Sequence, residues 1–267
     1  MLNPLVVMTY NICDGGQGRL ELIRQVILAH APHVLLLNEA DEQETVHSLA
    51  QQLGMTYVWA PGSGTKHIAL LSHVPIATWK IHNRRPITQA LLEVELRIDS
   101  KFPVRIYGLH LLPYSMFLPY EIARWRTIVA SLRVIQAHFH VPHLVLGDFN
   151  TIAAGESLDL AIFPTRVRRL MLLQANRIAH FALRPLTQAK YTDVFRAVHP
   201  YASGRTWMPT HLAARLDYIF ADPKMAACLH DCNIGTMDPA AQASDHFPVI
   251  AQFDLTKLSK NKTRAEI

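Results

Sequence analysis

Leu144-Val145-Leu146-Gly147-Asp148-Phe149-Asn150-Thr151 is the stretch from which the fold of this chain can be worked out. Its apolar start predicts a buried strand, and Gly147 lets the backbone turn where a ligand approaches closely. Asp148 and Asn150 are two residues apart, so in an extended chain their side chains point the same way. A strand that ends in an Asx turn would explain the same residues, because Asp and Asn favour turns.

Length and composition allow a large hydrophobic core. The 267 residues, half of them hydrophobic, fit one large α/β domain or two small ones. No apolar run is long enough to span a membrane, and the N-terminus lacks the basic segment of a signal peptide. Cys13, Cys228 and Cys232 agree with a reducing compartment and lack the spacing of a zinc site. We therefore expect a cytoplasmic protein, monomeric by default, with no stable membrane insertion.

The charge balance favours anionic partners. The net charge is +5 and the pI about 9.2, which suits nucleic acid, phosphorylated metabolites or acidic lipid without choosing among them. Basic residues concentrate in the tail at 256–267 and in a segment at about 153–191, which carries Arg166, Arg168 and Arg169. We expect the tail to be frayed and the segment to be a basic helical insertion.

Apolar runs separated by turn residues predict many strands with interspersed helices. Strands are expected at 5–9, 33–37, 56–60, 68–71, 76–81, 90–98, 104–109, 144–146, 216–221 and 248–253, with one more before Thr236. Helices are expected at 19–31, 42–53, 119–137, 165–177 and 178–189; on the third, the apolar residues Ile122, Trp125, Val129 and Leu132 share one side. This order favours a mixed sheet system with helices packed outside, in one domain over residues 1–255.

Polar residues stand at the ends of several of these strands. In a mixed sheet, the C-terminal ends of one set of strands meet the N-terminal ends of the opposed set, so these side chains can gather on one rim. Any one of them could be a cap or a turn residue, but so many on one edge indicate a site. The set comprises Asn11, Glu39, His110, Asp148 and Asn150 at C-terminal ends, and Asp217, Asp245 and His246 at or before N-terminal ends.

The residue types on this rim indicate metal-assisted chemistry. Carboxylate and amide oxygens suit Mg²⁺ or Mn²⁺, and such an ion commonly shares its ligands with a substrate phosphate. Histidines among carboxylates can titrate near neutral pH. Acid, base and a divalent ion around an open rim fit hydrolysis of a phosphoester.

Six short motifs carry these residues: Thr9-Tyr10-Asn11, Asn38-Glu39, Gly108-Leu109-His110, Gly147-Asp148-Phe149-Asn150, Leu216-Asp217-Tyr218-Ile219-Phe220 and Ser244-Asp245-His246-Phe247-Pro248-Val249. Taken together and in this order, they resemble the endonuclease/exonuclease/phosphatase family, which includes DNase I-like nucleases, sphingomyelinases and inositol polyphosphate phosphatases. The resemblance covers nearly the whole chain. It implies a DNase I-like, four-layer α/β/β/α sandwich of two mixed sheets, with the site on one edge of the paired sheets.

The resemblance also implies roles for the rim residues. Glu39 looks like the main ligand of Mg²⁺ or Mn²⁺, with Asn11 nearby and Asp245 helping. Asp148 looks like the group that orients or deprotonates the attacking water, and Asn150 like a donor to phosphoryl oxygens. His246, held by Asp217, looks like a catalytic histidine, and His110 is similar to the histidine that contacts phosphate or aids the leaving group.

Some positions depart from the family pattern or leave alternatives open. Asn38 stands where many relatives have Gln, with no chemical consequence expected, and Asp41 argues against abasic-site repair. Arg166 and Arg169 could hold substrate phosphates or could be solvated on a helical cover. Arg124 could reach the site, or could be a surface arginine.

Three functions compete at this stage. The first is a Mg²⁺-dependent phosphodiesterase acting on nucleic acid, motivated by the rim and the basic charge. The second is hydrolysis of a lipid, sugar or other small phosphoester, motivated by the apolar and basic residues near Leu170 to Leu173. The third is a binding module without catalysis, against which the intact set of acids and histidines argues.

Overall fold

Two mixed sheets form the centre of the molecule. The computed structural model describes residues 4–98, 103–113, 118–156, 159, 161, 165–166, 169, 180–208 and 213–258. The first sheet has the strand order β11-β12-β1-β2-β4-β3 and the second β5-β6-β7-β8-β10-β9. The strands of the first sheet are β1 (Leu5–Asn11), β2 (Val34–Asn38), β3 (Thr56–Ala60), β4 (Ile68–Ser72), β11 (Leu229–Ile234) and β12 (Val249–Phe253). Those of the second are β5 (Ile76–His82), β6 (Leu91–Arg97), β7 (Pro103–His110), β8 (His143–Asp148), β9 (Thr192–Asp193) and β10 (Asp217–Ala221).

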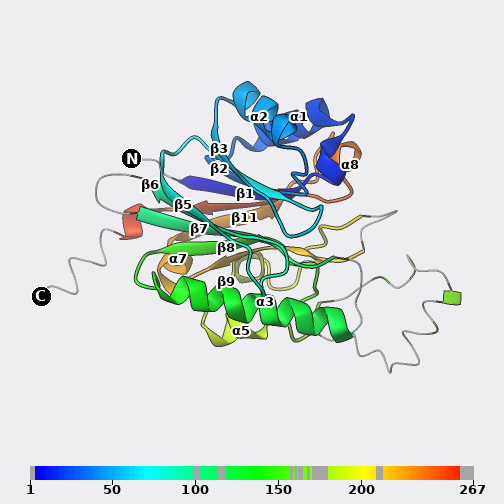
Figure 1. The fold of residues 1–267 in the computed structure, drawn as a ribbon, viewed down its shortest axis with the longest axis vertical. Coiled ribbons are helices and arrows are strands. Elements are labelled where there is room, and N and C mark those ends of the chain that lie inside the picture. The colour runs from blue at the N-terminus through cyan, green and yellow to red at the C-terminus, as the bar shows by residue number, and fades with distance from the viewer. Residues whose placement is uncertain are drawn as a thin grey trace, which may run out of the picture.

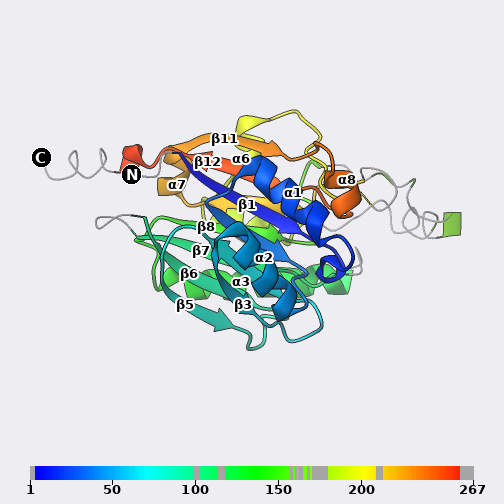
Figure 2. The same cartoon turned by 90° about the horizontal axis from the view of Figure 1, so that it is seen from above.

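Helices cover the outer faces of both sheets. In Figure 1, α1 (Leu20–His30), α2 (Gln43–Leu53) and α8 (Ala240–Ala243) lie over the first sheet, and α3 (Leu118–Gln136) and α5 (Arg184–Gln188) lie under the second. Figure 2 shows the same layers from above. The shorter η1 (Asp14–Gly16), α6 (Val194–Val198) and α7 (Pro223–Cys228) complete the described elements. The expected four-layer α/β/β/α sandwich is confirmed.

The alternation of side chains along the strands explains why the layers stack. In β2, Leu36 points into the core between the two sheets, while Leu35 and Leu37 pack with α1 and α2. In β8, Leu146 lies in the core between the sheets and Val145 packs against the side covered by α3. A strand buried on both faces reads as a continuous apolar run, which is the pattern seen in the sequence.

The register of the strands brings the polar ends to one edge. Asn11 pairs with Asn38 across the parallel strands β1 and β2. Asp148 stands between His110, its parallel neighbour in β7, and Asp217, its antiparallel neighbour in β10. The mixed directions of the strands therefore collect at one edge the residues that the motifs predicted there.

Gly147 permits a close approach that no other residue would allow. Its φ is +142°, and a Cβ atom at this position would lie 1.8 Å from the carbonyl oxygen of Leu109. Gly147 therefore lets β8 lie close to β7 at the edge where the polar residues gather.

The buried face of α3 differs from the expected one. Trp125 is 39% exposed, while Glu121, Arg124, Thr127 and Ser131 are buried together with apolar residues such as Ile128. Glu121, Arg124 and Thr127 bond to groups outside the helix and Ser131 to the helix backbone, so the face is polar and still buried. Of the apolar residues that share one side, Ile122, Val129 and Leu132 are half-buried, so this side borders the most buried face without forming it.

Other expectations differ only in extent. The helix predicted at 178–189 is confined to α5, the last turn before β9. Trp207 forms isolated bridges with Ala214 and His246. Most of the helix predicted at 165–177 and most of the tail lie outside the described residues. Among the residues described, no helix combines the length and apolar character needed to cross a membrane.

Candidate active site

Asn11 links two acidic groups at the edge of the sheets. Its Nδ2 donates to Glu39 Oε1 at 3.2 Å and to Asp148 Oδ2 at 3.0 Å. Glu39 follows β2 in the first sheet, and Asp148 ends β8 in the second. The carboxylates of both sheets therefore meet around one buried amide.

The first of these groups, here called the outer acidic group, consists of Asp14, Glu39 and Asp41. Their carboxylate oxygens lie within 4.8 Å of one another. The Lys66 ammonium contacts all three, at 2.5 Å from Glu39 Oε2 and 3.3 Å from Asp41, with Asp14 as its third partner. The Asp14 side chain is 77% exposed and that of Glu39 16%, so the group opens to solvent.

The backbone at Glu39 aims its carboxylate at this group. Glu39 has a φ of +56°, which is unusual for a residue with a side chain. Its Oε2 accepts a 2.8 Å hydrogen bond from the N–H of Asp14 in η1. Burial favours the neutral form, but this N–H, the Lys66 ammonium and His110 outweigh it and lower the pKa of Glu39 to about 2. Glu39 is therefore a carboxylate at any pH at which the protein works.

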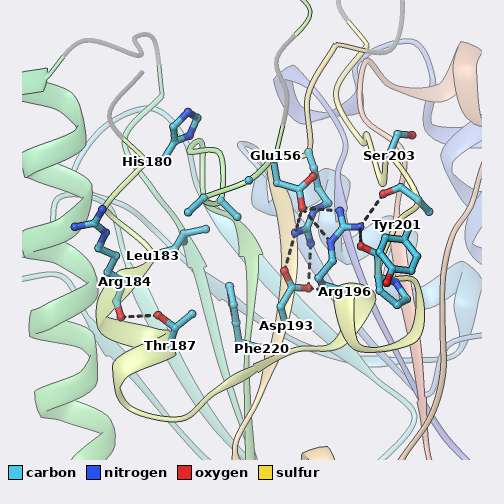
Figure 3. A pocket seen from close by; sticks show the side chains of 16 residues that line it. Glu156, His180, Leu183, Arg184, Thr187, Asp193, Arg196, Tyr201, Ser203 and Phe220 are labelled. Carbon is cyan, nitrogen blue, oxygen red and sulfur yellow. Dashed lines mark hydrogen bonds and ion pairs between the residues drawn. The ribbon is translucent and has the colours of Figure 1, made fainter. Parts of the chain in front are cut away.

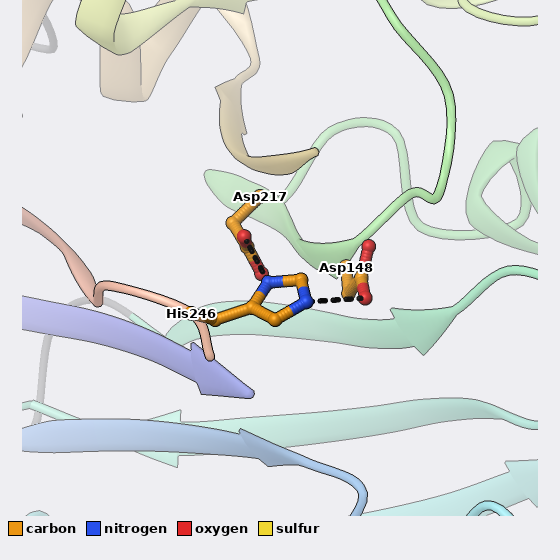
Figure 4. Close-up of side chains that lie close together, drawn as sticks. All are labelled: Asp148, Asp217 and His246. Atoms are coloured by element: carbon orange, nitrogen blue, oxygen red, sulfur yellow. Dashed lines mark hydrogen bonds and ion pairs between the residues drawn. The ribbon is translucent and has the colours of Figure 1, made fainter. Parts of the chain in front are cut away.

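The second group, here called the inner acidic group, consists of Asp148, Asp217 and His246 and is buried. Figure 4 shows the imidazole of His246 between the two carboxylates, with Nδ1 at 2.8 Å from Asp217 Oδ2 and Nε2 at 4.0 Å from Asp148 Oδ2. The Ser244 hydroxyl accepts from the N–H of His246 at 3.2 Å and donates to the Asn11 carbonyl at 2.7 Å. His246 is thus held both at its ring and at its backbone.

Burial and neighbouring charges shift the pKa values of His246 and Asp148. Burial alone would lower the pKa of His246, but Asp217, through charge and a hydrogen bond, and Asp148 raise it to about 10. Burial, followed by the charge of Asp217, raises the pKa of Asp148 above its usual range. Both shifts favour the protonated forms of Asp148 and His246.

His110 lies against the same carboxylate without a hydrogen-bond partner. Its Nε2 is 3.7 Å from Asp148 Oδ2, and within the described part of the chain neither ring nitrogen is hydrogen-bonded. Burial lowers the pKa of His110 to about 4 despite the opposing charge of Glu39. A buried polar ring left unpaired is costly, so this side chain is placed to meet a ligand group.

Asn150 and Asp245 are placed differently. Asn150, with a φ of +49°, donates its N–H to Asp148 Oδ1 at 2.8 Å and its amide to the Leu111 carbonyl at 3.1 Å. Asp245 accepts a hydrogen bond from the Cys13 thiol, whose pKa burial and Asp245 raise to about 11. As the structure describes these residues, Asp245 belongs to neither the outer nor the inner acidic group.

The expected substrate arginines differ in their surroundings. Arg124 is 2% exposed; its Nε donates to the Leu112 carbonyl at 2.9 Å, and its guanidinium lies 3.5 Å from Glu121. The alternative that Arg124 is a surface residue is therefore wrong, because Glu121 one turn earlier provides its counter-charge inside the protein. Arg166 and Arg169 are exposed, and Arg168 lies outside the described residues, as do residues 170–173.

Sequence reasoning missed the role of Asn38. Its Oδ1 accepts from the N–H of Asp148 at 3.2 Å, and its Nδ2 donates to the Leu109 carbonyl at 2.9 Å. The Thr9 hydroxyl donates to the same Oδ1 at 3.3 Å. The Asn38 side chain in β2 thus links the first sheet to β7 and β8 of the second sheet. The absence of a side chain at Gly147 leaves room for this contact.

Sequence reasoning also missed most of the outer acidic group. Asp14 lies in the short η1 and Lys66 in a loop, and Asp41 was considered only for its charge. The motif Asn38-Glu39 was the sole signal, because Asp14 and Lys66 reach Glu39 through contacts between residues 25 or more positions apart. Asp14, Glu39 and Asp41 supply the carboxylate oxygens that Mg²⁺ and Mn²⁺ prefer, and they already hold a cation, the Lys66 ammonium. The residues present therefore fit a divalent ion.

The cavity shown in Figure 3 has no rim residue in its lining. It has a volume of about 550 Å³ and lies beside β10 and α5. Its acids are already paired: Glu156 with Arg196 at 2.5 Å and Arg215 at 2.7 Å, and Asp193 with Arg215 at 2.7 Å. These ion pairs leave neither carboxylate of the lining available for chemistry at that cavity.

The histidines near β8 are also occupied by structural contacts. His143 is buried between Tyr191, at 2.6 Å, and the Val141 carbonyl, at 2.7 Å. His138 lies 3.6 Å from Glu93, and His140 is exposed. Of the residues that the structure describes, these three do not form a metal-binding group.

Comparisons with known proteins find similarity over most of the chain. A family model described as "Endonuclease/Exonuclease/phosphatase family" matches residues 8–246. An AP endonuclease from Archaeoglobus fulgidus has a similar structure, with a TM-score of 0.73 and 17% identity over 94% of this chain and 99% of that one. The 3' phosphatase NExo from Neisseria, bound to a product DNA hairpin, has a TM-score of 0.66 and 20% identity over 94% and 99%.

TDP2 from Caenorhabditis elegans is similar as well, with a TM-score of 0.64 and 16% identity over 94% of this chain and 74% of that chain. At these identities the likeness to the three solved structures is one of fold. None of the curated proteins compared with the sequence matches it.

Proposed function

Because this chain belongs to the endonuclease/exonuclease/phosphatase family, whose members are phosphoric ester hydrolases, we propose that it is a phosphodiesterase that uses Mg²⁺ or Mn²⁺ to cleave nucleic acid. The observation that carries the proposal is the Asn11 amide, which joins the Glu39 and Asp148 carboxylates at one edge. Metal-assisted hydrolysis uses an ionised metal ligand, such as Glu39, and a group that accepts a proton from water, such as Asp148.

We assign the metal to the outer acidic group. Glu39 would hold it, with Asn11 beside it and with Asp14 and Asp41 able to contribute oxygens once Lys66 moves away. A divalent ion bound there supplies positive charge to the phosphate oxygens. The low pKa of Glu39 supports this assignment, because metal ligands must be deprotonated.

We assign proton transfer to the inner acidic group. Asp148 orients the attacking water and accepts its proton, and Asn11 holds the Asp148 carboxylate through Nδ2. Asp217 fixes the tautomer of His246, so that Nε2 faces the reacting phosphate and Asp148. Asn150 and His110 lie against Asp148 and act as donors to the phosphoryl oxygens, where a single well-placed donor contributes about 10²–10³ in rate.

Nucleic acid is favoured as the substrate by two observations. The net charge of +5 attracts polyanions. Two solved proteins of similar fold are an AP endonuclease and a 3' phosphatase bound to a product DNA hairpin. The lipid alternative depended on residues 170–173, for which the structure describes no surface.

A substrate panel tests the proposal. Purified protein with Mg²⁺ or Mn²⁺ is expected to hydrolyse bis-p-nitrophenyl phosphate and to cleave DNA or RNA, and Asp148→Ala is expected to abolish both activities. Turnover of sphingomyelin or inositol phosphates with intact nucleic acid would replace the substrate assignment. A protein that binds ligands and hydrolyses no phosphoester would contradict the enzymatic proposal itself.

A further inference from the structure

A basic groove lies beside the candidate active site, between β5 and α3. A groove of about 640 Å³ is lined by Lys80, Arg84, Arg85 and Arg133, with His82 and several apolar residues between them. No Asp or Glu lines it. All four cationic side chains are exposed, and within the described ranges none of them forms an ion pair.

The charge of this basic groove is not neutralised by the neighbouring strand. Lys80 lies opposite Glu93 in the register of β5 and β6. Glu93, however, is buried, already binds Arg105, and accepts a hydrogen bond from His82 Nε2 at 2.9 Å. Like charges that line one concave surface without counter-ions attract an anionic ligand.

The loop that carries Arg84 and Arg85 is held in place. Ile87 is buried in the core beneath α3, and the Thr127 hydroxyl donates to the Pro86 carbonyl at 3.1 Å. The Ile87 N–H donates to the Arg84 carbonyl at 3.1 Å. The cations therefore project from a fixed loop, which lowers the entropy lost when a ligand binds.

The groove begins at the same edge as the active site. His82, the last residue of β5, pairs with Leu91, which pairs with Leu109, the neighbour of His110. The Ser63 hydroxyl donates to the Thr88 carbonyl and so joins this loop to the one that carries Lys66. A chain of phosphates that leaves the outer acidic group can therefore continue into the basic groove.

We propose that the groove lined by Lys80, Arg84, Arg85 and Arg133 binds the phosphate backbone of the nucleic-acid strand whose scissile phosphate lies at the active site. The inference rests on the proposed function and extends it to a polynucleotide held beyond the reacting bond. Four cations along one groove suit successive phosphates of one strand. A membrane fits less well, because none of the exposed large hydrophobic side chains lines the groove.

Binding of a fluorescein-labelled single-stranded oligonucleotide, measured by anisotropy in EDTA, tests the proposal without catalysis. Arg84→Glu and Arg133→Glu are each expected to weaken binding about tenfold and to reduce the slope of log K against log salt concentration. Arg97→Glu makes the same charge change at an exposed arginine at the other end of β6 and is the matched control. Its effect is expected to stay within about twofold, because salt screens distant surface charges.

Three results would overturn the inference: equal losses in all three variants, no binding by the wild type, or binding to phosphatidylserine vesicles in place of the oligonucleotide. The proposed function is tested separately, by measuring turnover of bis-p-nitrophenyl phosphate by the wild type with Mn²⁺. Absence of that turnover would contradict the proposed chemistry, whereas the anisotropy result alone decides whether the groove binds nucleic acid.

Discussion

The outer and inner acidic groups contain similar residues in opposite surroundings. Asp14, Glu39 and Asp41 open to solvent and hold the Lys66 ammonium, whereas Asp148, Asp217 and His246 are buried, with a hydrogen bond between His246 and Asp217. In the first group, a backbone N–H and the Lys66 ammonium outweigh burial and lower the pKa of Glu39. In the second group, burial raises the pKa of Asp148, whereas the neighbouring carboxylates outweigh burial and raise the pKa of His246. The two roles that we propose, metal binding and proton transfer, follow this difference, and the Asn11 amide lies between the two groups.

The largest effect should come from the inner group. Asp148→Asn keeps the shape of the side chain and removes the proton acceptor, so turnover of bis-p-nitrophenyl phosphate is expected to fall by about 10²–10⁴. Affinity for Mn²⁺, measured by calorimetry, is expected to stay close to the wild type. If Mn²⁺ binding were lost together with turnover, the two groups would not have separate roles.

Glu39→Gln tests the outer group in the same way. Affinity for Mn²⁺ is expected to fall by about 10–100-fold, and high Mn²⁺ concentrations should recover part of the turnover. Recovery by metal is the readout that separates this variant from Asp148→Asn, which metal should not rescue. A Glu39→Gln protein with unchanged Mn²⁺ affinity would contradict the assignment.

Asn38→Ala tests the link between the sheets that carry the two groups. It leaves the Asp148 N–H and the Leu109 carbonyl buried without this partner, and we expect it to lower the free energy of unfolding by ~1–3 kcal/mol. Because Asp148 loses its backbone anchor, kcat should fall about tenfold with little change in KM.

Thr9→Val is the matched control for Asn38→Ala. It removes only the 3.3 Å bond from the Thr9 hydroxyl to the same amide and leaves both contacts with the second sheet. Urea denaturation and steady-state kinetics should show a smaller loss for this variant. Equal effects on kcat would mean that Asn38 does not position Asp148.

The smallest effect concerns the cation already present in the outer group. Lys66→Met removes the ammonium that contacts Glu39 and Asp41, so a metal ion no longer competes with it. Affinity for Mn²⁺ is expected to rise about two- to fivefold, in line with ion pairs worth ~0.2–1 kcal/mol. Lys66→Arg keeps the charge and should bind Mn²⁺ like the wild type; a lower affinity in Lys66→Met would contradict this competition.

Much of the fold could be predicted because the strands are buried on both faces. Apolar runs such as 144–146 locate β8, and the polar residues that follow them locate the edge. The face of α3 could not be predicted from its apolar stripe. Glu121 is buried because the Thr151 hydroxyl and the Ala182 N–H donate to its carboxylate, and those residues are remote in the sequence.

The same limit applies to the candidate site. The residues at strand ends could be predicted, since strand direction decides where they gather. Asn38 could not, because an amide in a buried strand gives no sign that its partners belong to the other sheet. Lys66 could not, because its loop reaches Glu39 only after β4 pairs with β2. That residues 153–191 form an insertion stays a prediction.

Anomalous scattering from a crystal soaked in Mn²⁺ tests the division of roles most directly. The ion is predicted to lie against the Glu39 carboxylate, with Lys66 displaced from the outer acidic group. An ion bound between Asp148, Asp217 and His246 instead, with Lys66 still on Glu39, would contradict it.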